Sequence, residues 1–191
     1  RYKYRFLAEG DSWMDRSSAT TGSLPEFLAK AMDAGGDEVL IVNLSMFGHT
    51  MRRIGEAVQG EFAGWIDFWN FDAILLSAAG NDFIDAARDA APGQGILRDM
   101  AGQPLPAQGY DCVKQDAVAS LITGYLDPNF KVLYDAVRNS AKNAATPIFL
   151  NLYDTPVARD APAPPGRTAW LFEAHRKPAI DPSLWPDLTD G

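Results

Sequence analysis

Four short apolar runs constrain the fold of this chain more than any other feature. They cover residues 4–8, 38–43, 72–77 and 147–152, and each is too short to be a helix. Longer segments with helical spacing separate them. Strands that alternate with helices form a parallel sheet with right-handed crossovers. The sequence therefore predicts an α/β domain of three layers, with helices on both faces of a parallel sheet.

The segments between the runs carry recognisable helix signals. Ser23-Leu24-Pro25-Glu26 has the form of a capping box. Apolar residues then recur at helical spacing and predict one buried stripe, made of Leu24, Phe27, Leu28 and Ala31. A second helix is expected after Thr50, with its inward residues Met51, Ile54, Val58 and Phe62. A third begins at Asp127-Pro128, with its inward residues Phe130, Leu133 and Val137.

The length of 191 residues suits one domain, and no internal boundary or repeat is visible. Residues 92–145 form a long excursion that we interpret as a helical insertion, either a lid or an extra packed helix. Residues 155–180 are rich in proline and are predicted to be an irregular loop. Asp181-Pro182 then starts a last helix, and no fifth strand is predicted.

Composition excludes several classes of function. The net charge of −8 disfavours nucleic acid and anionic membranes as partners, because both need a basic face. Cys112 is the only cysteine, which rules out an intrachain disulfide, and we expect it to be a small buried hydrophobe. No apolar run approaches the ~20 residues of a membrane helix. The chain opens on Arg1, so we expect its true N-terminus to be missing. The compartment stays open, with a slight preference for the cytoplasm, and the oligomeric state is unknown.

A polar residue or a glycine follows each of the first three predicted strands: Ser12, Gly48 and Asn81. Because parallel strands end at the same edge of a sheet, these residues are expected to meet at one cleft. Ser12 would be a nucleophile, and the main-chain N–H groups of Ser12 and Gly48 with the Asn81 amide would hold an oxyanion. Each residue also has a simpler interpretation: Ser12 as a helix N-cap, Gly48 as a turn glycine and Asn81 as an ordinary turn residue.

Three motifs in this order resemble the first three conserved blocks of the SGNH (GDSL-type) hydrolases: Gly10-Asp11-Ser12, Asn43-Leu44-Ser45-Met46-Phe47-Gly48 and Gly80-Asn81-Asp82. The resemblance covers residues 4–155 and implies the flavodoxin-like fold of that family. It implies that Ser12 is the nucleophile and an oxyanion donor, with Gly48 and Asn81 as the other donors. It also implies supporting roles for Asp11 and Asn43. No cofactor is implied, and the partner would be a small-molecule ester.

The fourth block of that family, Asp-x-x-His after a fifth strand, has no match in this chain. His175 lies in a charged stretch and is expected at the surface. His49 directly follows Gly48, and nothing marks it as the base. We therefore interpret the chain as a fragment that ends before its last strand and its catalytic histidine. The predicted function is a serine esterase for short acyl esters, including acetyl esters of carbohydrates.

Four residues beside the chemical positions would line an acyl pocket or belong to the core: Trp13, Met14, Phe47 and Phe83. Two other functions stay open. One is a non-catalytic domain of the same fold that binds a carbohydrate or acyl ligand. The other is a metal-dependent phosphoesterase that uses the aspartates Asp11, Asp15, Asp82 and Asp85. Their spacing fits a metal poorly, so we predict no metal site.

Overall fold

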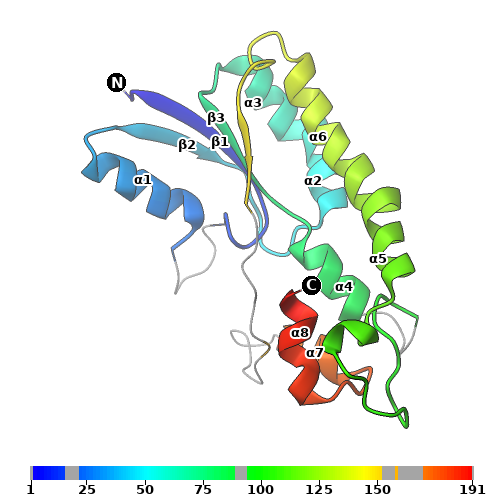
Figure 1. Ribbon diagram of the computed structural model, residues 1–191. Coiled ribbons are helices and arrows are strands. Elements are labelled where there is room, and N and C mark those ends of the chain that lie inside the picture. The colour runs from blue at the N-terminus through cyan, green and yellow to red at the C-terminus, as the bar shows by residue number, and fades with distance from the viewer. Residues whose placement is uncertain (1, 16–21, 89–93, 152–157, 159–169, 191) are drawn as a thin grey trace. The chain divides into compact units, whose positions relative to one another are not determined.

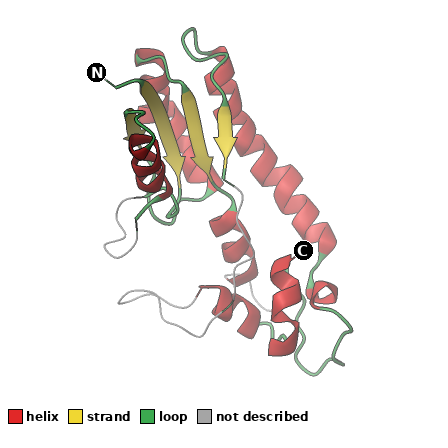
Figure 2. Cartoon of the chain, turned by 60° about the vertical axis from the view of Figure 1, so that its left-hand side comes forward, coloured by secondary structure: helices red, strands yellow, loops and turns green. Residues whose placement is uncertain are grey.

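The computed structural model describes residues 2–15, 22–88, 94–151, 158 and 170–190. Its centre is a four-stranded sheet whose neighbouring strands are all parallel, in the order β2-β1-β3-β4. Figure 2 shows the strand arrows pointing the same way. The strands are β1 (Tyr4–Gly10), β2 (Val39–Asn43), β3 (Ala73–Ser77) and β4 (Ile148–Leu150). The predicted α/β class and all four predicted strands are confirmed.

The chain divides into two compact units. Unit 1 contains residues 1–81 and 126–152, and therefore the whole sheet. Unit 2 contains residues 82–125 and 153–191. The interpretation of residues 1–191 as a single, incomplete domain with an insertion at 92–145 stays a prediction.

Helices lie on both faces of the sheet in unit 1. On one side α1 (Leu24–Ala34) packs against β2. On the other side three helices and a π-helical segment pack together, as Figure 1 shows. These are α2 (Met51–Ala57), η1 (Val58–Phe62), α3 (Ala63–Phe68) and α6 (Asp127–Asn139). The backbone kinks at Gly60, which is why the predicted long helix after Thr50 is divided.

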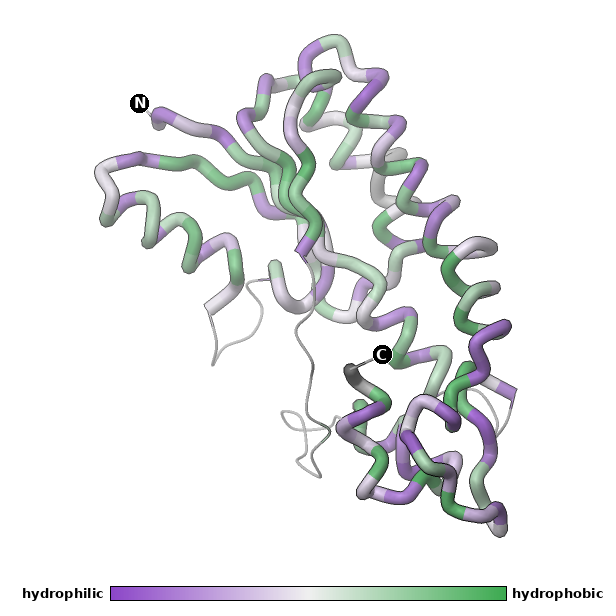
Figure 3. The backbone as a smooth tube through the Cα atoms, in the orientation of Figure 1, coloured by the Kyte–Doolittle hydropathy of each residue, from purple (hydrophilic) through white to green (hydrophobic). Residues whose placement is uncertain are grey.

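The core of unit 1 lies between the sheet and the layer that contains α2 and α6. Leu7 pairs in register with Ile74, and both side chains are fully buried. The inward residues predicted for the helices meet them there. Confirmed as buried are Met51, Ile54, Phe62, Leu133 and Val137. Figure 3 shows the strands as largely apolar and α6 with polar and apolar stretches, the pattern of a helix with one buried face.

The predicted buried stripe of α1 is wrong in part. Leu24 is 38% exposed and Phe27 is 57% exposed, and Ala31 is exposed as well. The helix itself begins as predicted, with the Glu26 carboxylate accepting a hydrogen bond from the Ser23 N–H at 3.1 Å. The cause is tertiary: α1 packs mainly against β2, an edge strand, which offers too little surface to cover the stripe.

Unit 2 has a small core of its own, formed by Leu97, Cys112, Ile180 and Leu184. Cys112 is fully buried, as predicted. Unit 2 contains η2 (Gly109–Cys112), α5 (Gln115–Leu121), α7 (Trp170–Arg176), η4 (Pro182–Leu184) and α8 (Trp185–Asp190). Two further elements, α4 (Gly80–Arg88) and η3 (Ile122–Leu126), extend into it. The helix start predicted at Asp181 is confirmed, since its carboxylate accepts the Ser183 N–H at 2.9 Å.

The loop predicted over 155–180 is corrected at its end, where the chain forms α7. The reason is local, because no proline interrupts residues 166–177. The residues 155–157 and 159–169 of this predicted loop lie outside the described residues.

Candidate active site

Ser12 lies in a tight turn directly after β1. The turn is closed by the Met14 N–H, which donates to the Asp11 carbonyl at 3.1 Å. It is joined to the next strand by the Asp11 N–H, which donates to the Ser77 carbonyl at 3.1 Å. Gly10 permits this close approach, since a Cβ there would lie 2.5 Å from the Ser77 oxygen. The serine is therefore held at the carboxyl edge of the sheet by contacts that only a glycine allows.

Asp11 holds the turn rather than facing solvent. It is 1% exposed, and its Oδ1 accepts hydrogen bonds from the Trp13 N–H at 3.1 Å and from the Ser77 hydroxyl at 2.9 Å. Asn43 connects the same turn to the end of β2. Its Nδ2 donates to the Met14 carbonyl at 2.6 Å. These contacts hold the turn in place, and the supporting roles of Asp11 and Asn43 in a reaction stay predictions.

The loop after β2 brings Gly48 to the same edge. The Met46 N–H donates to the Gly10 carbonyl at 3.0 Å, which fastens this loop beside the serine turn. Gly48 has a φ of +73°, the left-handed conformation that glycine adopts without strain. The glycine therefore has a backbone reason for its place in this loop, and its role as an oxyanion donor stays a prediction.

Asn81 stands in the first turn of α4, after β3. Its Nδ2 donates to the His49 carbonyl at 3.0 Å. An asparagine amide carries two N–H groups, so this bond uses one of them and leaves the other. Hydrogen bonds thus join the ends of β1 and β2, the ends of β1 and β3, and the β2 loop to α4.

Three donors at this edge have no acceptor in the described part of the chain: the N–H of Ser12, the N–H of Gly48 and the second N–H of Asn81. The Ser12 hydroxyl likewise has no hydrogen-bond partner among the described residues. Polar groups of folded proteins are normally paired with protein or water. Open donors beside a serine hydroxyl are therefore available to a ligand oxygen.

His49 is partly buried within this loop. Its Nδ1 is inaccessible to solvent and has no hydrogen-bond partner in the described residues. Burial lowers the pKa of His49, the charge of Arg53 lowers it further, and the charge of Asp15 opposes both. The imidazole is therefore neutral at pH 7, which is the form that can accept a proton.

His175 was expected at the surface, and this expectation is wrong. It is 4% exposed and its ring lies 5.5 Å from that of Trp185. Burial lowers its pKa to about 4, and its Nδ1 has no partner in the described residues. The charged neighbours Arg176 and Lys177 are exposed, whereas the His175 ring packs against Trp185 and is buried. His175 lies in unit 2.

The residues predicted to line an acyl pocket have different surroundings. Trp13 is 52% exposed, and Phe47 is partly buried in the Gly48 loop. Met14 is only 4% exposed and belongs to the core. Phe83 is partly buried in unit 2. A role in substrate binding stays a prediction for this set, and accessibility favours Trp13.

Three residues at this edge of the sheet were not predicted from the sequence: Glu9, Ser77 and, for its structural use, Asp15. Glu9 is 2% exposed at the end of β1, and burial raises its pKa to about 7, with the Gly10 N–H opposing that shift and the charge of Glu61 adding to it. Ser77 is fully buried and donates to Asp11. The signal for Glu9 was a carboxyl side chain directly between the apolar run 4–8 and the serine turn. For Ser77 the signal was a hydroxyl at the end of β3.

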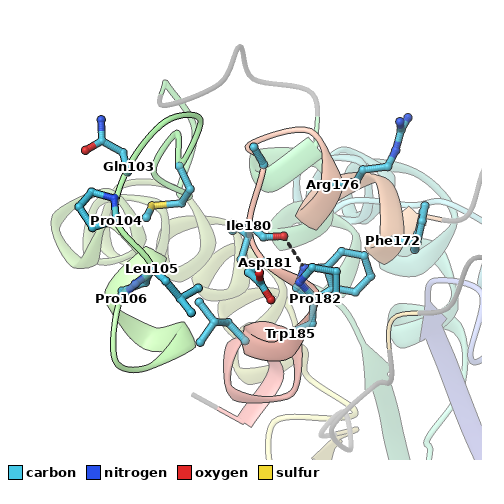
Figure 4. A pocket seen from close by; sticks show the side chains of 13 residues that line it. Gln103, Pro104, Leu105, Pro106, Phe172, Arg176, Ile180, Asp181, Pro182 and Trp185 are labelled. Carbon is cyan, nitrogen blue, oxygen red and sulfur yellow. Dashed lines mark hydrogen bonds between the residues drawn. The ribbon is translucent and has the colours of Figure 1, made fainter.

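A separate cavity of about 570 Å³ lies within unit 2. Figure 4 shows it between the loop that carries Gln103 to Pro106 and the segment that carries Ile180 and Trp185. Its lining is mostly apolar, and the Trp185 Nε1 is already bonded to the Ile180 carbonyl at 3.0 Å. No Ser, Thr, Cys, Lys or His side chain is among the described residues that line the cavity. Whether the 92–145 excursion acts as a lid stays a prediction.

Two searches of the described residues bear on other kinds of site. No group of three or more His, Cys, Asp or Glu side chains there is arranged to hold a metal ion. Within the same residues, no helix has the length and the apolar character needed to cross a bilayer.

The fold and this edge of the sheet define an α/β protein with a serine turn after its first strand. No protein-family model and no curated protein sequence matches the chain. Solved structures do match it. The lipase Lip_vut3 from a goat rumen metagenome is 14% identical with a TM-score of 0.52, over 80% of this chain and 65% of that one.

Two further matches are esterases. AlinE4, described as an SGNH-hydrolase family esterase, is 15% identical with a TM-score of 0.46, over 98% of this chain and 77% of that one. The W215I variant of Axe2, an acetyl xylan esterase from Geobacillus stearothermophilus, is 16% identical with a TM-score of 0.45. The match covers 78% of this chain and 59% of that one. The chain spans less than two thirds of the lipase and of Axe2. The match with the lipase shows that this chain shares its fold.

Proposed function

We propose that this protein is a serine ester hydrolase that cleaves short acyl esters through an acyl-enzyme on Ser12. The observation that carries the proposal is the set of three donors without acceptors, the N–H groups of Ser12, Gly48 and Asn81, beside a serine hydroxyl that is itself unpaired within the described residues. Donors that are already fixed in place lower the barrier to forming an oxyanion, because they need not reorganise during the reaction.

The reaction would proceed in two steps. The Ser12 Oγ attacks the ester carbonyl carbon while its proton passes to a base, and the carbonyl oxygen becomes an oxyanion held by the three N–H donors. The tetrahedral intermediate collapses, the alcohol leaves with the proton from the base, and the acyl group stays on Ser12. A water molecule then attacks the acyl-enzyme in the same way and releases the carboxylic acid. None of these steps needs a cofactor.

The base is proposed to be a histidine outside these 191 residues. The sequence contains no Asp-x-x-His pair. His175 is buried against Trp185 with a pKa of about 4, which makes it a weak base. His49 is neutral, but its Nδ1 is enclosed.

The proposed substrate is a neutral ester of a short acyl group, with acetyl esters of carbohydrates as one class. The net charge of −8 opposes anionic substrates. Trp13 directly follows Ser12 and is 52% exposed, so it offers a flat face on which a sugar ring or an alkyl group can stack.

The test is covalent labelling of the full-length protein with a fluorophosphonate probe, followed by mass spectrometry of the labelled peptide. We expect labelling on Ser12 that is lost in Ser12→Ala. Ser45→Ala is the matched control, because Ser45 lies in the Gly48 loop and is 8% exposed, and its buried hydroxyl has no hydrogen-bond partner in the described residues. Labelling that persists in folded Ser12→Ala refutes the nucleophile.

The missing Asp-x-x-His pair favours one alternative, a domain that binds an acyl or carbohydrate ligand without cleaving it. In that case the full-length protein would not be labelled by the probe. Calorimetry would detect binding of an acetylated oligosaccharide, and Ser12→Ala would bind it as well as the wild type does. Hydrolysis of a phosphate ester that EDTA abolishes and Ser12→Ala spares would instead indicate the metal-dependent phosphoesterase.

A further inference from the structure

The Asp15 carboxylate reaches from the serine turn to the loop that carries Gly48. Its Oδ2 accepts a hydrogen bond from the Phe47 N–H at 2.7 Å. A charged acceptor at this distance makes one of the stronger hydrogen bonds in proteins. The two residues are 32 positions apart in the sequence, so this hydrogen bond joins the turn after β1 to the loop after β2.

Asp15 is itself held firmly at its end of this link. Its own N–H donates to the Asp11 carbonyl at 3.1 Å. The preceding residue, Met14, is 4% exposed, and its carbonyl accepts from Asn43 Nδ2 at 2.6 Å. The carboxylate is therefore presented from a turn that the rest of the edge already fixes.

The link sits one residue before the proposed oxyanion donor. The direction of the Gly48 N–H is set by the peptide plane between Phe47 and Gly48. On one side of that plane the Phe47 N–H is fastened to Asp15. On the other side the His49 carbonyl is fastened to Asn81 and the His49 N–H to Met46. Without these flanking hydrogen bonds the backbone of Gly48 would be free to turn, because glycine has the widest choice of backbone conformations.

We propose that Asp15 is a positioning residue that fixes the Gly48 N–H by holding the Phe47 N–H. It acts through the loop and does not touch the substrate, because its Oδ2 is engaged with main chain. This inference rests on the proposed function for its effect on turnover. The hydrogen bond that it invokes exists independently of that function and can be measured without a substrate.

The first experiment measures amide hydrogen exchange by NMR on the 191-residue chain. In Asp15→Ala we expect the Phe47 N–H to lose its protection and the His49 N–H, which donates to the Met46 carbonyl, to exchange faster. Asp72→Ala is the matched control, because its carboxylate accepts the Arg5 N–H at 2.8 Å at the amino edge of the same sheet. Unchanged protection of the Phe47 and His49 N–H groups in folded Asp15→Ala overturns the inference, whatever the protein catalyses.

The second experiment measures hydrolysis of p-nitrophenyl acetate by the full-length protein. Asp15→Ala should lower kcat by roughly 10–100-fold with little change in KM, because a misplaced donor weakens binding of the transition state alone. Asp15→Asn keeps an acceptor oxygen and should recover most of the loss, whereas Asp72→Ala should match the wild type. If wild-type protein has no Ser12-dependent turnover, the proposed function fails and the exchange experiment still decides the role of Asp15. A kcat for Asp15→Ala equal to that of Asp72→Ala overturns the positioning role.

Discussion

Two asparagines at opposite edges of one sheet show how differently the same amide can be used. Asn143, at the amino edge, is fully buried, and all its side-chain hydrogen-bonding capacity is engaged. Its Oδ1 accepts from Phe71 N–H at 2.8 Å and from Thr146 Oγ1 at 3.1 Å, and its Nδ2 donates to the carbonyls of Ile66 and Trp69 at 2.5 and 2.8 Å. Asn81, at the carboxyl edge, gives one N–H to His49 and keeps the other.

The difference separates two kinds of polar network. At the amino edge a completed network fixes the loops that enter β3 and β4, and leaves nothing for a ligand. At the carboxyl edge the turns are just as firmly tied, by Asp11, Asn43 and Asp15, but the donors beside Ser12 are left over. We infer that changes at the amino edge act on stability, whereas changes at the carboxyl edge act on chemistry.

Asn143→Ala should produce the largest loss of stability. The substitution leaves the main-chain N–H of Phe71 and the carbonyls of Ile66 and Trp69 without their hydrogen-bond partner. Because unpaired buried polar groups cost free energy, we expect the free energy of unfolding to fall by roughly 4 kcal/mol. Urea unfolding measures this. The comparison between the edges fails if stability is kept and turnover is lost instead.

Asn81→Ala should show the reverse pattern. Removing one oxyanion donor typically costs about 10²–10³-fold in turnover, or roughly 3 kcal/mol of transition-state binding. Its free energy of unfolding should change far less than that of Asn143→Ala, because within the described residues the Asn81 side chain makes one hydrogen bond, to the His49 carbonyl. Steady-state kinetics on the full-length protein provides the measurement. Wild-type turnover in Asn81→Ala would remove this residue from the site.

Glu9→Gln tests a buried carboxyl group near the carboxyl end of β1. A carboxyl whose pKa is raised to about 7 in the folded state binds its proton more tightly there than when unfolded. Its contribution to stability is complete below its ordinary pKa of 4.5 and is lost as the pH rises through 7. We expect wild type and Glu9→Gln to be similar at pH 4.5, and the variant to be more stable by roughly 2 kcal/mol at pH 8. Parallel stability curves between these pH values would contradict the shift.

Asp72→Ala should have the smallest effect. Its carboxylate bonds the Arg5 N–H at 2.8 Å, but the side chain is exposed and water can replace it. We expect a loss of about 1 kcal/mol or less in the free energy of unfolding, and unchanged turnover. A large fall in turnover would show that the amino edge reaches the chemistry.

Much of unit 1 could be predicted from the sequence because its signals are local. Apolar runs identified the strands, and the residues after them identified the serine turn, the Gly48 loop and Asn81. The strand order β2-β1-β3-β4 could not be read in this way, because it depends on contacts between distant segments. The same holds for the exposure of Phe27 and the burial of His175, which are decided by β2 and Trp185. The role of Asp15 was hidden because its partner, Phe47, is 32 positions away.

The close packing of Gly10 on Ser77 has a consequence for directed evolution. If the codon for residue 10 is randomised and colonies are chosen only for soluble expression, glycine should dominate the survivors although no ester was ever supplied, since any side chain would collide with the Ser77 carbonyl 2.5 Å away. The same screen applied two residues later should accept many amino acids at Ser12. A screen for folding would thus restrict residue 10 and tolerate changes at residue 12. Comparing it with a screen for activity would separate positions that the fold requires from positions that the reaction requires.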